Sequence, residues 1–488
     1  MKKKIVILIS LVIIVIAILT TIYAITGEVQ PNKKDSNQIA NAPILLEGMK
    51  PIAFEEGKEE PIILTDEQMK EGIWYDYVSQ QEGTQSGGTS KWANAQTKDG
   101  SIWVWIPRYS YKIEWDESKN VGKIDVMFLD GNTNKNKQGQ DVTRLGYIVH
   151  PAFKDGKNNQ YKNGEWDEEI TGIWVSKFEA GYAGQKNTAS ENVEIVNSSL
   201  QFQKDSKNIL GPIKAGETAI TYPVFMGKTY SYNNIELGDM YSLSQILSEP
   251  GNPYGFNENV DSHLMKNSEW GAVAYLAHSE YGRNGSKITI NNLSVSKVVE
   301  YAETVTGYAG KTINEVANQI ETLDEKLKDS YNEKSYAWYT KQGKLASTTG
   351  NLYGVYDLNG GSSEYVASYL NGINEEKANY YAKSLLENKQ SNKYCTIYQS
   401  AGSNIENYEI NKSIYGDALA ETSKRGNGYT SWFGETSIYI KEDAGFFLRS
   451  GDYSRVGYSG IFDFNNHSGH SFGSYGFRCI LITKERGK

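Results

Sequence analysis

The sequence predicts an α+β protein that is rich in loops and short antiparallel strands and that carries a transmembrane helix at its N-terminus. Three observations support this fold class. The apolar run Ile5–Ile25 follows a group of lysines. Short apolar and aromatic stretches, separated by Gly, Asn and Ser clusters, recur along most of the 488 residues and are typical of strands joined by turns. Two further segments have the 3.6-residue periodicity of helices.

The N-terminal run predicts a single membrane-spanning segment. As a helix, Ile5–Ile25 is about 30 Å long, which matches the hydrocarbon core of a bilayer. Because Lys2–Lys4 precede the run and Glu28 is the first acidic residue after it, the rest of the chain should lie outside the cytoplasm. The alternative is a cleaved signal peptide and a secreted protein, but such peptides have apolar regions of about 7–15 residues, and Ile22–Ala24 is a poor cleavage site. We therefore expect an uncleaved anchor over residues 1–27.

Charge and cysteine content exclude several function classes. A net charge of −9 argues against nucleic acid and anionic membrane surfaces as partners. Two cysteines exclude a disulfide-rich scaffold and a thiolate metal cluster. Cys395 and Cys479 both lie in strand-like sequence, so either a disulfide or two buried free thiols fits them. An aromatic content of 12% indicates an ordered globule.

The rest of the chain divides into three parts. Residues 28–59 are polar and contain prolines, which predicts a tether. Residues 60–170 predict a strand-rich section, in which Trp103–Tyr109 is expected to be a strand ended by proline. Residues 171–488 predict the main domain, which starts with the alternating strand Gly172–Glu179.

Two segments of the main domain predict helices. Leu264–Tyr281 places apolar side chains on one face, with Asn267 or Ser268 as its N-cap and Gly282 just beyond its end. The second segment, about 293–341, combines helical periodicity with interleaved Glu and Lys and predicts an inserted helical hairpin. Such an insertion either caps the domain or carries a partner-binding face.

The segment between residues 446 and 482 carries the strongest functional signal. Its apolar ends, Phe446–Leu448 and Phe477–Ile482, suit strands, whereas the Gly, Ser and Asn stretch between them predicts a surface loop. Aromatic rings among small polar residues are typical of a recognition surface, and the alternative is rings that tuck back onto the domain. The predicted ligand contacts are the rings and the hydrogen-bonding side chains of this segment: Tyr453, Tyr458, Phe462, Phe464, Asn465, Asn466, His467, His470, Phe472 and Tyr475.

Three sequence blocks occur in a fixed order along the main domain. They are Leu264-x4-Glu269-Trp270-x-Ala272-x-Ala274, then Asn351–Tyr365 with Gly354, Tyr356, Asp357, Asn359 and Glu364, and then Arg449–Tyr453 followed by Gly476–Cys479. Over residues 170–482 these blocks resemble the formylglycine-generating enzyme (sulfatase-modifying factor) family, a branch of the C-type lectin fold. The resemblance implies a C-type-lectin-like domain.

Charged and amide residues of these blocks are expected to be structural. Asp357 precedes a turn whose backbone amides it can bond, Glu364 and Arg449 are plausible ion-pair partners, and Arg478 needs a bonded partner within its apolar strand. The predicted structural residues are Glu269, Trp270, Asp357, Asn359, Glu364, Arg449 and Arg478.

The departures from that family argue against catalysis. Its enzymes hold copper with two cysteines between the last two blocks, but Ser450–Gly476 contains none, and Cys479 alone cannot replace two soft ligands. The calcium and sugar signatures of the lectin branch are also absent, since Gly251–Pro253 lacks the acidic residue. What remains is similar to non-catalytic members of bacterial surfaces and diversity-generating retroelement systems, in which the counterpart of Asp452–Tyr475 is a hypervariable ligand-binding face.

No other motif predicts chemistry. His467 and His470 share their loop with Asp463, but no third ligand has the spacing of a metal site. Phosphate-loop, dinucleotide, nucleophile-elbow and zinc-protease motifs are missing from the sequence. We therefore expect no cofactor, no metal and no catalytic residue.

The function hypothesis is a membrane-anchored, extracytoplasmic, non-catalytic binding protein that presents an aromatic face to a protein or glycan. Two alternatives stay open: an oxidoreductase related to the formylglycine-generating enzymes, and a structural subunit of a bacterial or phage surface assembly.

Overall fold

The computed structural model describes residues 40–79, 88–116, 118, 120–157, 165–182, 222–294, 304–310, 319–320, 334–387 and 393–484. These ranges form a mixed α+β fold in which most strands pair antiparallel. No helix within them is long and apolar enough to span a bilayer. The predicted fold class is corrected on this point, because an N-terminal transmembrane helix is not part of the described fold. The segment Ile5–Ile25, which carried that prediction, lies outside the described ranges.

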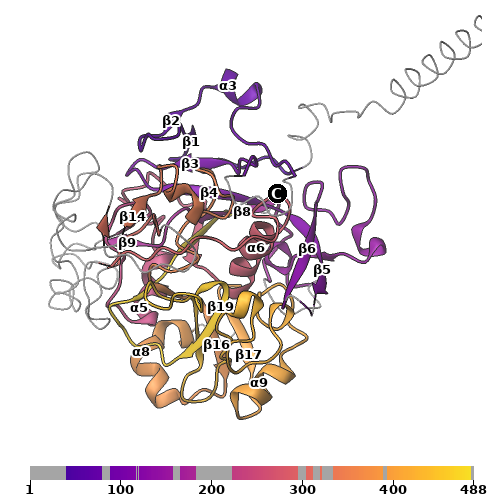
Figure 1. Ribbon diagram of the computed structural model, residues 1–488, viewed down its shortest axis with the longest axis vertical. Helices are drawn as coiled ribbons and strands as arrows, with labels where there is room; N and C mark the ends of the chain where they lie inside the picture. Colours follow the sequence, from indigo (N-terminus) through magenta and orange to yellow (C-terminus); the bar gives the residue numbers. More distant parts are fainter. Residues whose placement is uncertain are drawn as a thin grey trace, which may run out of the picture.

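The largest sheet joins distant parts of the chain. Its order is β11-β21-β8-β4-β3-β1-β2, and every pairing is antiparallel. The strands are β1 Lys50–Ala53, β2 Ile62–Ile63, β3 Asn94–Gln96, β4 Ile102–Pro107, β8 Gly172–Ser176, β11 Val260–Leu264 and β21 Cys479–Thr483. Strand β1 comes from the predicted tether, and β3 and β4 come from the predicted N-terminal section. Both sections therefore share one sheet with the predicted main domain (Figure 1).

Two strands of this sheet were predicted, β4 from the stretch Trp103–Tyr109 and β8 from the alternating stretch Gly172–Glu179. Every residue of β4 and β8 is buried, which explains their unbroken Ile, Val and Trp content. The predicted strand Trp103–Tyr109 is divided in two, because β4 ends at Pro107 and the next strand starts at Tyr109.

A four-stranded sheet holds the C-terminal segment. Its order is β19-β18-β15-β20, with β15 and β20 parallel and the other pairs antiparallel. The strands are β15 Ser363–Tyr365, β18 Phe446–Ser450, β19 Gly460–His467 and β20 Tyr475–Gly476. Strand β19 lies within the stretch predicted to be a surface loop, so that prediction is wrong for residues 460–467.

The remaining strands form smaller sheets of two or three strands. They are β5 Tyr109–Asp116, β6 Val121–Phe128 and β7 Ile148–Val149; β9 Gly181–Tyr182 and β10 Pro223–Val224; β12 Tyr308–Gly310, β13 Gln319–Ile320 and β14 Lys334–Ala337; and β16 Ser368–Asn371 with β17 Thr396–Gln399. Strands β12 to β14 fall within the predicted helical insertion. Its described pieces are strands and turns instead of helices, and the other parts of 293–341 lie outside the described ranges.

The predicted helix over Leu264–Tyr281 is confirmed as α6, Asn267–His278. Its N-cap is Lys266, one residue before the predicted position, and the Glu269 carboxylate accepts a hydrogen bond from the Lys266 backbone amide at 2.8 Å. All residues of α6 are buried, as expected for a helix enclosed on every side. The α-helices that were not predicted are α3 Asp66–Lys70, α5 Leu237–Gln245, α8 Glu375–Glu387 and α9 Asn404–Ile410. The short 3-10 helices are η1 Val142–Leu145, η2 Pro151–Phe153, η5 Gly343–Ala346, η6 Ala420–Thr422 and η7 Trp432–Gly434.

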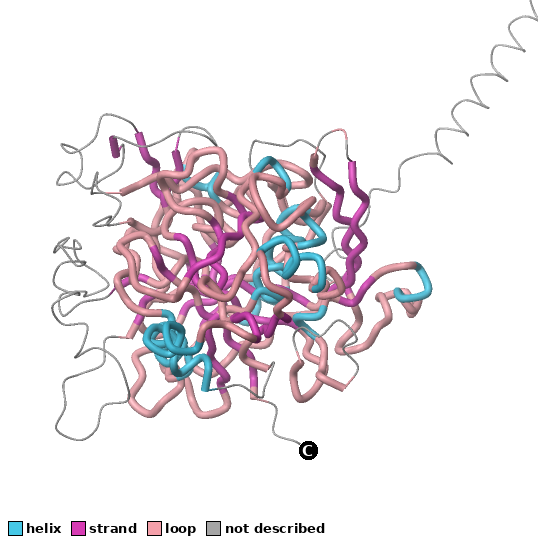
Figure 2. The backbone as a smooth tube through the Cα atoms, turned by 90° about the horizontal axis from the view of Figure 1, so that it is seen from below, coloured by secondary structure: helices cyan, strands magenta, loops and turns pink. Residues whose placement is uncertain are grey.

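Aromatic side chains supply much of the core, while loops connect most elements (Figure 2). Seven tryptophans are at most 2% exposed: Trp92, Trp103, Trp105, Trp174, Trp270, Trp338 and Trp432. Because large rings fill so much volume, segments with few aliphatic residues can still enter the interior. The aromatic rings of the C-terminal segment therefore allow part of it to be buried.

Candidate functional site

The structure divides the ten predicted ligand-binding residues into three groups. Tyr453, Phe462 and Phe464 are buried in the core. Tyr458 is 50% exposed and its ring centroid lies 4.3 Å from that of the exposed Tyr429. The other six lie together at the end of β19, in the loop that follows it and at the start of β20: Asn465, Asn466, His467, His470, Phe472 and Tyr475.

Phe462 and Phe464 are wrong as predicted ligand anchors. Both are 0% exposed, because both faces of β19 are covered over residues 460–464. The Phe462 ring lies 4.9 Å from Trp432, and the Phe464 ring lies 6.0 Å from Phe447. Tyr453, at 7% exposed, is also unavailable to a ligand. These three rings therefore pack onto the domain, which was the alternative prediction for this segment.

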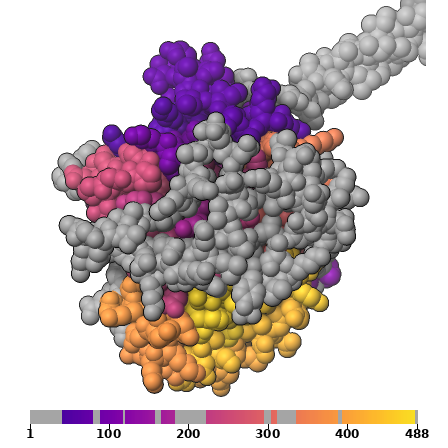
Figure 3. All heavy atoms as spheres, turned by 90° about the vertical axis from the view of Figure 1, so that its left-hand side faces the viewer, coloured from indigo at the N-terminus to yellow at the C-terminus, as the bar shows by residue number. Residues whose placement is uncertain are grey.

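The other end of β19 brings predicted rings together at the surface. His467 and His470 are stacked, with centroids 4.3 Å apart and an interplanar angle of 22°. Tyr475 lies 4.7 Å from His467, and Phe472 lies 5.1 Å from Tyr475. Tyr381 of α8 lies 5.9 Å from His470, and Figure 3 shows this helix (orange) beside the C-terminal segment (yellow). We name the four partly buried residues His467, His470, Phe472 and Tyr475 the histidine–aromatic patch.

A buried tyrosine holds the two histidines in place. The hydroxyl of Tyr365, in β15, donates to the backbone carbonyl of His470 at 2.9 Å and is also hydrogen-bonded to Nδ1 of His467. A hydroxyl has one proton, so His467 must carry its hydrogen on Nδ1 while Tyr365 donates to His470. Nε2 of His467 is then a hydrogen-bond acceptor.

The loop between the histidines is fixed by its backbone. Gly469 has a φ of +92°, and its carbonyl accepts a hydrogen bond from the Leu237 amide at 3.1 Å. A Cβ at this position would lie 3.1 Å from the Phe446 ring, so glycine allows the loop to pack closely. The amide of Asn466 bonds the side chain of Asn465 at 2.9 Å. The patch is therefore ordered before any ligand arrives.

The patch is electrically neutral at pH 7. Burial, with smaller contributions from the neighbouring His470 and Arg455, lowers the pKa of His467 to about 3. Burial also lowers the pKa of His470. A ligand would therefore meet rings and neutral hydrogen-bonding groups.

The two cysteines are buried free thiols, which decides between the two predicted alternatives. Burial raises the pKa of both, that of Cys479 to about 12, so they are protonated at neutral pH. Within the described ranges no group of three or more His, Cys, Asp or Glu residues is arranged to hold a metal ion.

The predicted pairing of Glu364 with Arg449 is wrong. The two residues face each other in the register of β15 and β18, but the Glu364 carboxylate pairs with Arg478 through contacts of 2.7 and 2.5 Å. Arg449 instead donates to the carbonyl of Asp463 at 2.8 Å and to the side chain of Asn267 at 2.8 Å. The buried Arg478 therefore has the partner that its apolar strand required.

Other predicted structural residues are also buried and bonded. Trp270 donates to the Ile461 carbonyl at 2.7 Å, and Asn359 donates to the Ile288 carbonyl at 2.6 Å. Asp357 was expected to bond the turn that follows it. It accepts instead from the Gly307 amide at 2.9 Å, a partner 50 positions away.

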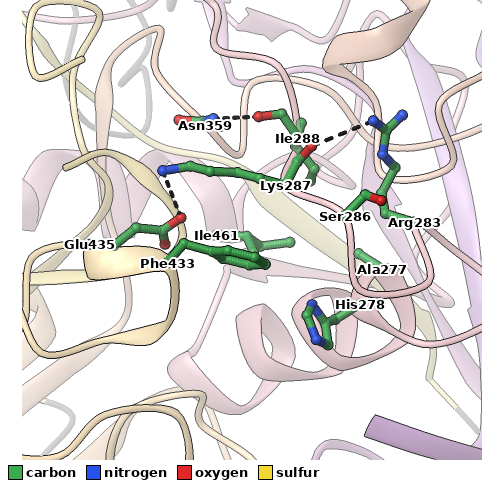
Figure 4. Close-up of a pocket in the computed structure, with 10 residues that line it drawn as sticks. All are labelled: Ala277, His278, Arg283, Ser286, Lys287, Ile288, Asn359, Phe433, Glu435 and Ile461. Atoms are coloured by element: carbon green, nitrogen blue, oxygen red, sulfur yellow. Dashed lines mark hydrogen bonds and ion pairs between the residues drawn. The ribbon is translucent and has the colours of Figure 1, made fainter. Parts of the chain in front are cut away.

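A separate hollow is lined by residues that were not predicted from the sequence to have a role, except for Asn359 (Figure 4). It encloses about 260 Å³, including the part open to solvent. Lys287 points toward Glu435, with Nζ 3.2 Å from Oε1, and away from Arg283. The residues around the hollow come from the end of α6 and the loop after it, from the turn at Asn359, from η7 and the residue after it, and from β19. Because they are scattered over the chain, no local signal marked them as one site. The lining residues are Ala277, His278, Arg283, Ser286, Lys287, Ile288, Asn359, Phe433, Glu435 and Ile461.

No family model matches this chain, and none of the curated proteins matches it.

Proposed function

We propose that this protein is a non-catalytic ligand-binding protein whose recognition surface is the histidine–aromatic patch. The observation that carries the proposal is the stacked pair of His467 and His470 beside two further partly buried rings. Histidine and aromatic side chains that remain partly accessible offer both apolar area and hydrogen bonds.

Preorganisation supports this proposal. Tyr365 fixes both histidines, and Gly469 fixes the loop between them. A surface that is already ordered loses little conformational entropy on binding, so more of the contact energy appears as affinity. The buried hydroxyl of Tyr365 makes one hydrogen bond with each histidine, as donor to the His470 carbonyl and as acceptor from His467.

The sequence resemblance supports the same function. Non-catalytic relatives of the formylglycine-generating enzymes bind ligands with the counterpart of Asp452–Tyr475, and the patch lies in this segment. Because the histidines are neutral, the proposed ligand is an uncharged polar group, such as a glycan or a neutral stretch of a protein surface.

Binding arrays of glycans and of bacterial surface proteins, probed with the full chain, test this function. We expect a bound array member whose affinity falls about 30-fold in Phe472→Ala and in Tyr475→Ala, which corresponds to about 2 kcal/mol for a hot-spot ring. Tyr429→Ala is the matched control, because this ring is exposed and lies outside the patch. Equal affinity of the patch variants and the control would rule out the patch as the recognition surface.

A further inference from the structure

We infer that the hollow lined by Arg283 and Lys287 is a binding site for a carboxylate group. This site is distinct from the histidine–aromatic patch, and it does not depend on the function proposed for that patch.

Arg283 is a buried cation with almost no hydrogen-bond partners. It is 4% exposed, and the one hydrogen bond that it makes to a described residue, from Nη2 to the Lys287 carbonyl, is 3.4 Å long. Across the described ranges, Nε and Nη1 have no partner. Guanidinium groups buried in proteins are normally paired, because an unpaired buried charge is strongly destabilising. The free donors of Arg283 therefore point to a missing anion.

The described residues that line the hollow leave an excess of one positive charge. Arg283 and Lys287 are cationic, and Glu435 lies 3.2 Å from Lys287. The second oxygen of Glu435 is occupied, since it accepts from the Phe462 amide at 2.9 Å. His278 adds no charge at pH 7, because burial lowers its pKa to about 4. One monovalent anion would balance the site.

The neighbouring backbone makes room for the guanidinium. Gly350 has a φ of +68°, and a Cβ there would lie 2.2 Å from Nη1 of Arg283. Any side chain at this position would displace the arginine. The loop around Gly350 and the loop of Arg283 thus fit each other closely.

The size of the hollow restricts the ligand class. The hollow is small and partly open to solvent, so it has no room for a whole small molecule. It suits a terminal group, and a carboxylate matches the planar fork of an arginine. A free carboxylate such as formate and the carboxylate of an acidic sugar share this chemistry.

Thermal denaturation of the full chain in sodium formate, compared with sodium chloride at equal ionic strength, tests the site. A ligand that binds the folded state raises Tm with concentration until the site is saturated. We expect a rise of about 2 °C or more for the wild type. The matched variant is Arg283→Met, which keeps an unbranched, flexible side chain and removes the hydrogen-bond donors.

Two separate results are expected for Arg283→Met. Without a carboxylate, its Tm should exceed that of the wild type, because an unpaired buried charge is removed. With formate, its Tm should not respond. Arg144→Met is the control, because this arginine is 85% exposed, and its response to formate should equal that of the wild type.

Two further titrations identify the source of the carboxylate. A response to glucuronate at lower concentrations than to formate, with none to glucose, would indicate an acidic sugar. Equal responses to formate and glucuronate would indicate a free carboxylate. The inference is overturned if formate has no effect on the wild type, or if Arg283→Met is destabilised and still responds to formate.

Discussion

The hydroxyl of Tyr365 is hydrogen-bonded to Nδ1 of His467, and this contact links the buried sheet to the surface patch. Tyr365 is 0% exposed, whereas His467 is partly accessible. The same hydroxyl donates to the His470 carbonyl at 2.9 Å. One buried group thus positions both rings that a ligand would contact.

Tyr365→Phe should loosen the patch without removing a ring from it. Loss of a buried hydrogen bond lowers the free energy of unfolding by about 1–2 kcal/mol, and the affinity for the array ligand should fall several-fold. Urea denaturation and binding titrations measure the two effects. Tyr339→Phe is the matched control, because the buried Tyr339 hydroxyl has no partner among the described residues. If both variants behave alike, Tyr365 does not position the histidines.

Glu364→Gln should destabilise the fold strongly. It removes the charge that pairs with the buried guanidinium of Arg478, and breaking a buried ion pair on one side typically lowers the free energy of unfolding by about 3–5 kcal/mol. Urea denaturation provides the measurement. Glu387→Gln breaks an exposed pair with Lys383 and should leave stability unchanged. Similar losses in the two variants would argue against a structural role of the buried pair.

Phe464→Ala should mainly lower stability, whereas Phe472→Ala should mainly weaken ligand binding. Phe464 is fully buried, so its truncation should lower the free energy of unfolding by about 3–5 kcal/mol. Phe472 is only partly buried, so its truncation should mainly weaken binding. The two variants carry the same chemical change, and each serves as the control for the other. A large loss of stability in Phe472→Ala would place this ring in the core instead of the binding surface.

Asp463→Asn should stabilise the protein in a pH-dependent manner. Burial raises the pKa of Asp463 to about 7, although a hydrogen bond with Thr436 acts in the opposite direction. The folded state therefore keeps a proton that the unfolded state releases near pH 4, and stability falls as the pH rises from about 4 to 7. Asparagine cannot ionise, so it should raise the free energy of unfolding at pH 8, by about 4 kcal/mol at most, and change it little at pH 4.

Urea denaturation at several pH values checks this dependence. Asp443→Asn is the control, because Asp443 is largely exposed, and its effect should not vary with pH in the same way. A gain of stability in Asp463→Asn that is equal at pH 4 and pH 8 would exclude the buried carboxylate as its cause.

Several elements could be predicted from local pattern alone. Leu264–Tyr281 combines helical periodicity with terminal signals, and α6 forms there. The apolar stretch ended by Pro107 and the alternation over Gly172–Glu179 predicted the strands β4 and β8. Strand β19 was missed although Phe462-Asp463-Phe464 alternates, because the surrounding Gly, Ser and Asn residues are typical of loops. The residues of the hollow were missed because single charged residues in loops carry no periodic signal.

By itself the sequence determined the composition of the C-terminal segment, the position of α6 and the need of Arg478 for a partner. Only the tertiary structure decided that this partner is Glu364, that Phe462 and Phe464 fill the core, and that His467 and His470 stack at the surface. The reason is physical. Local pattern depends on neighbours along the chain, whereas burial and pairing depend on which distant segment covers each face of a strand, and this is settled only when the sheets assemble.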